Sequence, residues 1–316
     1  MSQPLLACLL TLSLLPLTSP EAKPPAPESP MTLSRPDGRS LAWREVGPPE
    51  GRPVFFFHGG ADTGLAAQLL LEAAETTGTR IIAPDRPGFG ASSAHPERGL
   101  RSWASDVGVL ADHLRVARFD LIGHSGGGPH ALAVAALLPD RVDRVALVAG
   151  GAPKDAAPKG MALPFRLNRW FAISSPGMQR RFVESHRSGL QNPERFLSQW
   201  GRMSRADGAL FVDQPEVASL IIEEMTQAYS GGIDGPALEG RLYYQDWGFE
   251  LGEVHQKVDL FYGDADPMAP VGWGEYFEER LPSATLHILA GEGHFSGLVH
   301  YARRILDSLR AIEPAL

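Results

Sequence analysis

A serine in a glycine-rich turn is the residue whose type and spacing most clearly permit covalent chemistry. Residues 123–127 read Gly-His-Ser-Gly-Gly, follow the apolar run 119–122 and precede an Ala- and Leu-rich stretch over 131–138. A strand that turns sharply into a helix holds a serine hydroxyl above the sheet edge, and glycines avoid clashes in that turn. The pattern predicts that Ser125 is a nucleophile; an ordinary glycine-rich turn is the alternative.

A second glycine-containing loop follows another buried strand. Residues 53–57 read Pro-Val-Phe-Phe-Phe, which is typical of a strand covered on both faces, and His58-Gly59-Gly60 comes next. Backbone N–H groups in such loops stabilise the negative charge that forms on a carbonyl oxygen during acyl transfer. We predict that the N–H groups of Gly60 and Gly126 form an oxyanion hole; a simple turn is the alternative reading of these glycines.

A general base is expected downstream. Residues 284–289 read as a strand and lead into Gly291-Glu292-Gly293-His294-Phe295, a glycine-flanked loop that exposes a histidine. Imidazole has a pKa of about 6.5 and can take a serine proton near neutral pH. His58 belongs to the predicted oxyanion loop, His124 lies inside the serine turn, and the remaining histidines do not lie in a loop after a strand. We therefore predict that His294 is the base.

The acid that orients the histidine is expected in the loop after residues 258–262. That loop, residues 263–270, carries Asp264 and Asp266. A carboxylate beside the base holds its useful tautomer and stabilises the imidazolium. We favour Asp266 because it lies three residues beyond Gly263, with Asp264 as the alternative and Asp155 as a third candidate.

Together these segments resemble the α/β-hydrolase superfamily, in its group of lid-bearing serine hydrolases. The resemblance runs from about Thr32 to about Leu309 and rests on residues 58–60, 85–92, 123–128, 263–267 and 291–294. It implies a mostly parallel, roughly eight-stranded twisted sheet with helices on both faces and a mainly helical lid. Dehalogenases and epoxide hydrolases of this superfamily carry Asp at the position of Ser125, so those reactions are disfavoured. Carbon–carbon hydrolases and lyases share the triad and remain open.

The remaining pattern agrees with an α/β architecture. Residues 37–39 read as the turn of an opening hairpin, and helical stretches over 65–75 and 100–114 alternate with apolar runs. Active-site loops then belong at the carboxyl ends of the strands. We divide the chain into a core of residues 31–150 and 251–316 and a lid of residues 151–250. We expect most of the lid aromatics to pack in its core: Phe165, Trp170, Phe171, Trp200, Phe211, Tyr229, Tyr243, Tyr244 and Trp247.

Composition narrows the function classes. The 316 residues carry a net charge of −8, which argues against a nucleic-acid partner. No stretch approaches the roughly 18 apolar residues of a membrane span, so stable membrane insertion is not expected. The single cysteine, Cys8, excludes an intrachain disulfide, and no metal-binding motif occurs. We expect no cofactor and no metal, a small-molecule substrate, and a monomer or weak homo-oligomer.

Residues 1–30 differ in composition from the rest. Residues 5–17 are apolar enough for a signal-peptide core, and residues 18–30 are rich in Pro, Ala and Glu, like a linker. No Lys or Arg precedes the apolar run, and no clean small-x-small cleavage site follows it. We therefore favour a cytoplasmic protein with a leader, or with a start near Met31, over export.

The sequence as a whole predicts a serine hydrolase for a small to medium, largely apolar ester, lactone or related acyl compound. The acyl group would pass through a covalent ester with Ser125, as in carboxylic ester hydrolases. Carbon–carbon bond hydrolysis or lyase chemistry at the same triad is the alternative enzyme class. A receptor-like protein with little turnover is the alternative outside enzymes.

Overall fold

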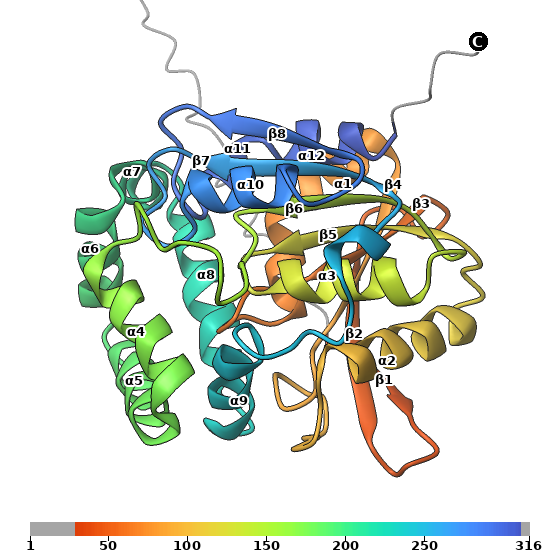
Figure 1. Cartoon of the computed structure of the whole chain (residues 1–316), viewed down its shortest axis with the longest axis horizontal. Coiled ribbons are helices and arrows are strands. Elements are labelled where there is room, and N and C mark those ends of the chain that lie inside the picture. The colour runs from red at the N-terminus through yellow and green to blue at the C-terminus, as the bar shows by residue number, and fades with distance from the viewer. Residues whose placement is uncertain (1–28, 311–316) are drawn as a thin grey trace, which may run out of the picture.

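The computed structural model describes residues 29–310, and eight strands there form one mixed sheet (Figure 1). The strand order is β1-β2-β4-β3-β5-β6-β7-β8, with β1–β2 and β2–β4 antiparallel and every other neighbouring pair parallel. This confirms the predicted mostly parallel sheet of an α/β-hydrolase fold. The strands are β1 Met31–Ser34, β2 Ser40–Val46, β3 Arg52–Phe57, β4 Thr79–Pro84, β5 Phe119–His124, β6 Val142–Val148, β7 Lys257–Gly263 and β8 Ala284–Leu289.

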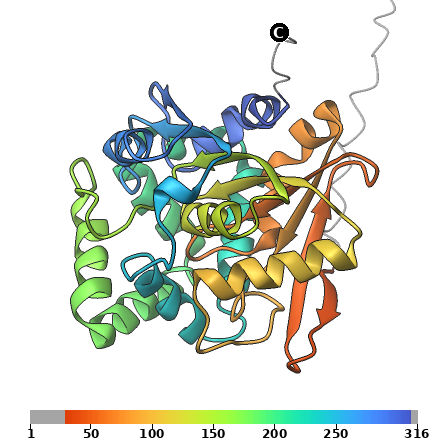
Figure 2. The same ribbon diagram turned by 45° about the vertical axis from the view of Figure 1, so that its right-hand side comes forward.

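Helices cover both faces of the sheet, as the alternation of side chains along a strand requires. Phe55 and Phe57 of β3 pack in one core with helices α2, α3 and α10, while Val54 and Phe56 pack on the opposite face with η1, α1, α11 and α12. Figure 2 shows ribbon helices on both sides of the sheet. These helices are η1 Gly64–Leu70, α1 Leu71–Thr77, α2 Leu100–His113, α3 Gly127–Leu137, α10 Val271–Glu278, α11 Ser296–His300 and α12 Ala302–Ser308.

Six further helices follow one another between β6 and β7 and form a cap at one end of the sheet (Figure 1, green to teal). Four of them, α4, α5, α6 and α8, carry a proline at their first or second residue, where its fixed φ and missing N–H are tolerated. All six lie inside residues 151–250, the predicted lid. They are α4 Leu163–Ser174, α5 Pro176–Gly189, α6 Pro193–Met203, α7 Arg205–Asp213, α8 Pro215–Ala228 and α9 Asp234–Leu242.

The predicted leader, residues 1–30, lies outside the described residues except for Ser29 and Pro30. The cytoplasmic location drawn from it therefore stays a prediction. Within residues 29–310, no helix is both long enough and apolar enough to span a bilayer.

Candidate active site

Ser125 lies in a strained turn between the end of β5 and the start of α3. Its φ of 52° is in the left-handed region, which non-glycine residues rarely adopt. Its N–H donates to the carbonyl of Val148 at 2.9 Å, which ties the turn to β6. A Cβ at Gly127 would lie 2.0 Å from the carbonyl oxygen of Phe57, so only glycine fits there. The predicted strand–turn–helix around the serine is therefore present.

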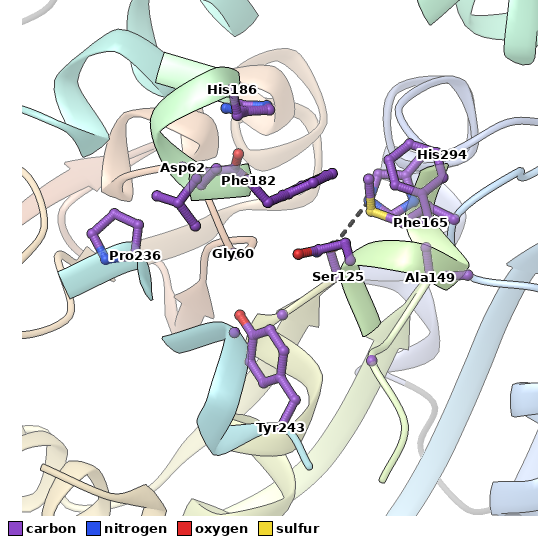
Figure 3. Close-up of a pocket in the computed structure, with 18 of the residues that line it drawn as sticks. Gly60, Asp62, Ser125, Ala149, Phe165, Phe182, His186, Pro236, Tyr243 and His294 are labelled. Atoms are coloured by element: carbon purple, nitrogen blue, oxygen red, sulfur yellow. Dashed lines mark hydrogen bonds between the residues drawn. The ribbon is translucent and has the colours of Figure 1, made fainter. Parts of the chain in front are cut away.

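A continuous hydrogen-bonded relay joins three of the predicted residues. His294 Nε2 lies 2.9 Å from Ser125 Oγ (Figure 3), and His294 Nδ1 lies 2.7 Å from Asp266 Oδ2. The serine follows β5, the aspartate follows β7 and the histidine follows β8. The carboxyl ends of these parallel strands share one edge of the sheet, which is why residues so distant in sequence meet. The imidazole can thus accept the serine proton and be held by a carboxylate.

The acid loop directs only one of its two carboxylates towards His294. The other oxygen of Asp266, Oδ1, accepts hydrogen bonds from the N–H groups of Met268 at 2.7 Å and Ala269 at 3.0 Å. Asp264 instead accepts from Gly291 N–H at 2.7 Å, where it supports the neighbouring loop. Asp155, the third candidate, accepts from the Tyr276 hydroxyl at the surface. The geometry thus favours Asp266.

The groups around His294 raise the pKa of its imidazole and so make it a stronger base. Burial opposes the imidazolium, but the charge of Asp266 and its hydrogen bond outweigh burial, and the pKa of His294 is raised. The carboxylates of Asp207 and Asp62 act in the same direction. The imidazole is therefore suited to take a proton from Ser125 and to keep it while a tetrahedral intermediate forms.

Gly60 and Gly126, the predicted oxyanion donors, lie side by side next to Ser125. Both line the same pocket, and a Cβ placed on Gly126 would lie 2.9 Å from the backbone nitrogen of Gly60. The loop that carries Gly60 is held by Arg86, which donates to the carbonyls of His58 and Gly59 at 2.5 Å each. This arginine comes from the segment 85–92 and fixes the path of the loop.

Arg86 also connects the loop to the cap. Its Nε lies 3.1 Å from Glu239 Oε1 of α9, and Arg98 Nη1 lies 2.5 Å from Glu239 Oε2. All three side chains are buried. Burial opposes the charge of Glu239, but the two guanidiniums outweigh it and lower the pKa of this carboxyl far below its usual range. The cluster therefore stays ionised and joins cap to core.

A second cap carboxylate holds the loop that carries His294. Asp207 of α7 accepts from the backbone N–H groups of His294, Phe295 and Ser296 at 2.9 to 3.0 Å, and from the Trp200 indole at 2.8 Å. Three successive N–H groups on one carboxylate fix a backbone strongly, because bonds to a charged acceptor are the stronger kind. Asp207 therefore positions the histidine without touching its ring.

The pocket above Ser125 is enclosed by the cap and encloses about 1090 Å³, including its opening to solvent. Five of the nine lid aromatics named above line it, which is more than we expected: Phe165, Trp200, Tyr229, Tyr243 and Tyr244. Among its described lining residues there is no Lys or Arg, and Asp62 is the acidic one. Burial raises the pKa of Asp62 to about 6. The pocket is therefore largely apolar, and the acidic residue in its described lining disfavours a negatively charged ligand when that carboxyl is ionised.

Sequence reasoning missed three residues of this site. Asp62, Asp207 and Glu239 show no local motif: Asp62 lines the pocket, and Asp207 and Glu239 act through contacts with segments far away along the chain. Tyr243 was expected only as one of several lid aromatics. Within residues 29–310, no group of three or more His, Cys, Asp or Glu side chains is placed to hold a metal ion.

Residues 52–301 match a family model described as "alpha/beta hydrolase fold". Two curated relatives illustrate the range of similar proteins. One is a dihydrolipoyllysine-residue acetyltransferase component of the acetoin cleaving system from Pseudomonas putida, 39% identical over 131 residues, which cover 41% of this chain and 34% of that protein. The other is a 2-hydroxy-6-oxononadienedioate/2-hydroxy-6-oxononatrienedioate hydrolase from Burkholderia vietnamiensis, 26% identical over 258 residues, which cover 76% of this chain and 80% of that protein. The chain thus spans only about a third of the length of the first relative.

Among solved structures, the esterase RhEst1 from Rhodococcus sp. ECU1013 superposes with a TM-score of 0.65 at 19% identity. The match covers 90% of this chain and all of that one. At this identity the similarity concerns the fold.

Proposed function

Because this chain belongs to the alpha/beta hydrolase fold family, we propose that it is a serine hydrolase that forms an acyl-enzyme on Ser125. The substrate class we propose is an uncharged ester, lactone or related acyl compound of small to medium size. The observation that carries the proposal is the relay from Ser125 through His294 to Asp266, with distances of 2.9 and 2.7 Å, at the floor of an apolar pocket.

Each residue has a definite role in the proposed reaction. Ser125 Oγ attacks the carbonyl carbon while His294 Nε2 takes its proton, and the carbonyl π electrons move onto oxygen. The N–H groups of Gly60 and Gly126 donate to that oxyanion. The C–O bond to the leaving alcohol then breaks, and His294 returns the proton to it. Water repeats these steps on the acyl-enzyme and releases the acid.

The lining of the pocket supports an uncharged substrate. Apolar side chains surround the serine, among them Met161, Phe165, Phe182 and Met225, and they favour alkyl or aryl groups. The described lining residues offer no Lys or Arg to pair with a carboxylate, and Asp62 would repel one. The Burkholderia relative is named for a dioate substrate, which carries two carboxylates. This contrast favours ester hydrolysis over carbon–carbon cleavage of such an anion.

The first experiment is labelling with a fluorophosphonate, read by intact mass on the wild-type protein and on Ser125→Ala. A single adduct on the wild type and none on the variant would support an activated serine. A folded wild-type protein without an adduct would overturn the proposal and favour a binding protein with little turnover.

A substrate series then tests the proposed class. We expect p-nitrophenyl esters of short and medium acids to be hydrolysed. We expect kcat/KM for monoesters of dicarboxylic acids to be lower by at least about tenfold. A tenfold loss requires only about 1.4 kcal/mol of charge repulsion in the transition state. Preferred turnover of the anionic esters would contradict the proposed substrate class while leaving the serine chemistry intact.

A further inference from the structure

One tyrosine of the cap reaches the place where the oxyanion would form. Tyr243 follows the last residue of α9, and its hydroxyl lies above both predicted donors. A Cβ on Gly126 would lie 1.9 Å from the Tyr243 hydroxyl oxygen, and a Cβ on Gly60 would lie 3.0 Å from it. Figure 3 shows the hydroxyl pointing into the pocket towards Ser125 and Gly60. Its position thus comes from the cap, whereas both backbone donors come from the core.

The Tyr243 hydroxyl is buried; it makes no regular hydrogen bond by distance and angle among the described residues, but the Glu239 carboxylate lies near enough to attract its proton. Burial raises its pKa, as does the nearby Glu239 carboxylate, so the oxygen keeps its proton and remains a donor. Glu239 is already ion-paired with Arg86 and Arg98. A buried donor with only this weak contact is poorly satisfied in the free protein, and a ligand oxygen would be a better-placed acceptor for it.

Neighbouring residues hold the ring in this orientation. The Trp247 indole donates to the Tyr243 carbonyl at 3.0 Å, which fixes the backbone just after α9. The ring of His130 meets the Tyr243 ring edge to face, with centroids 6.5 Å apart, and His130 Nδ1 lies 3.1 Å from the Gly126 carbonyl oxygen. The tyrosine is therefore in place before a substrate binds, as electrostatic stabilisation of a transition state requires.

We propose that the Tyr243 hydroxyl is a third oxyanion donor, supplied by the cap, beside the N–H groups of Gly60 and Gly126. This role rests on the serine hydrolase function proposed above. When Ser125 Oγ bonds to the carbonyl carbon, the carbonyl oxygen gains the π electrons and accepts the tyrosine O–H as a hydrogen bond. The tyrosine proton stays on its oxygen, and the hydrogen bond weakens again when the leaving group departs.

The same geometry explains the residue after the nucleophile. A side chain at position 126 would occupy the space that the Tyr243 hydroxyl fills, since even a Cβ there would be 1.9 Å away. Glycine is thus required at position 126 for the Tyr243 hydroxyl to lie where it does. The Gly126 N–H and the Tyr243 O–H are therefore neighbouring donors at the same site.

The test compares Tyr243→Phe with the wild type and with Tyr276→Phe, whose hydroxyl donates to Asp155 at the surface. Hydrolysis of p-nitrophenyl butyrate gives kcat and KM. Two ketones of equal chain length serve as inhibitors: a trifluoromethyl ketone, which forms an anionic tetrahedral adduct with serine, and a methyl ketone, which does not. We expect Tyr243→Phe to lower kcat by about 100-fold, as for the loss of one oxyanion donor, with little change in KM.

The inhibitors separate a catalytic role from a structural one. We expect the trifluoromethyl ketone to bind Tyr243→Phe about 100-fold more weakly and the methyl ketone to bind as before, because only the adduct carries the oxyanion. Unchanged kcat and unchanged trifluoromethyl ketone affinity would overturn the inference, as would equal weakening of both ketones. If the wild type itself fails to react with a fluorophosphonate, the proposed function fails and the inference falls with it.

Discussion

At the scale of single residues, the site depends on how two side chains are held against each other. Asp266 uses one carboxylate oxygen for two backbone N–H groups and the other for His294, so the carboxylate cannot turn away from the imidazole. Its charge keeps the pKa of a buried histidine raised, where burial alone would lower it. The base strength of His294 thus depends on Asp266.

A pH profile of kcat/KM checks this dependence. His294 must be neutral to accept a proton, so activity should fall on the acid side as the pH drops through its raised pKa, above about 6.5. Asp266→Asn removes the negative charge beside His294, so burial then lowers the pKa of the imidazole. The acid limb of the profile should therefore move to lower pH, and the maximal kcat/KM should fall by about 10⁴-fold.

Asp264→Asn is the matched control, because it changes the same chemical group in the same loop at a carboxylate that bonds Gly291 rather than His294. We expect its acid limb to stay where it is in the wild type. A larger loss in Asp264→Asn than in Asp266→Asn would overturn our assignment of the acid.

At the scale of elements, the short helix α11 and its preceding loop depend on the cap helix α7. Asp207 supplies an acceptor to three successive N–H groups at the start of α11, and those groups have no helical partner of their own. A carboxylate there also lies at the favourable end of the helix dipole. The cap therefore contributes to the position of His294 as well as to the pocket walls.

We expect Asp207→Asn to lose about 2–4 kcal/mol of unfolding free energy, because its amide presents a donor to groups that are all donors. The loop with His294 should move, so kcat should fall as well, by about tenfold or more, since misplacement by about 1 Å is costly. Chemical denaturation and steady-state kinetics measure both. Asp213→Asn, at the exposed end of α7, is the control and should leave the free energy of unfolding and kcat unchanged. A wild-type kcat in Asp207→Asn would contradict the positioning role.

At the scale of the whole molecule, cap and core are joined by buried charge. Glu239 of α9 meets Arg86 and Arg98 of the core, and Arg86 in turn holds the loop of Gly60. Removing one partner of such a cluster leaves uncompensated buried charge, which costs more than the cluster itself contributes. The attachment of the cap and the shape of the oxyanion loop are therefore coupled.

Replacing Glu239 by Gln should lower the free energy of unfolding by about 3–5 kcal/mol, because two buried guanidiniums lose their counter-charge. Thermal or urea denaturation would measure this loss. Glu223→Gln, on the exposed side of α8, is the control and should change little. Equal stability of Glu239→Gln and the wild type would contradict the expectation that these arginines depend on the charge of Glu239.

The sequence predicted the parts of the site that are encoded locally. Ser125, Asp266 and His294 each follow a recognisable strand and lie in a glycine-containing loop, so a short stretch of sequence reveals them. Asp207 lies 87 residues from His294 along the chain, and its neighbours resemble any helix start. Helical periodicity shows which residues are apolar but not whether they face the cap core or the pocket. For that reason the pocket aromatics and Tyr243 could not be assigned.

The bonds of Asp207 have a consequence for engineering this protein. A chimera that replaces the cap with one from another hydrolase, or with a short loop, would remove the acceptor of the N–H groups at 294–296 together with the old pocket. Such a graft would be expected to fail in catalysis even when the sheet folds, unless the donor segment restores an acidic side chain at that point. Substrate range is therefore better redesigned by point changes on α4 and α5, whose residues line the pocket.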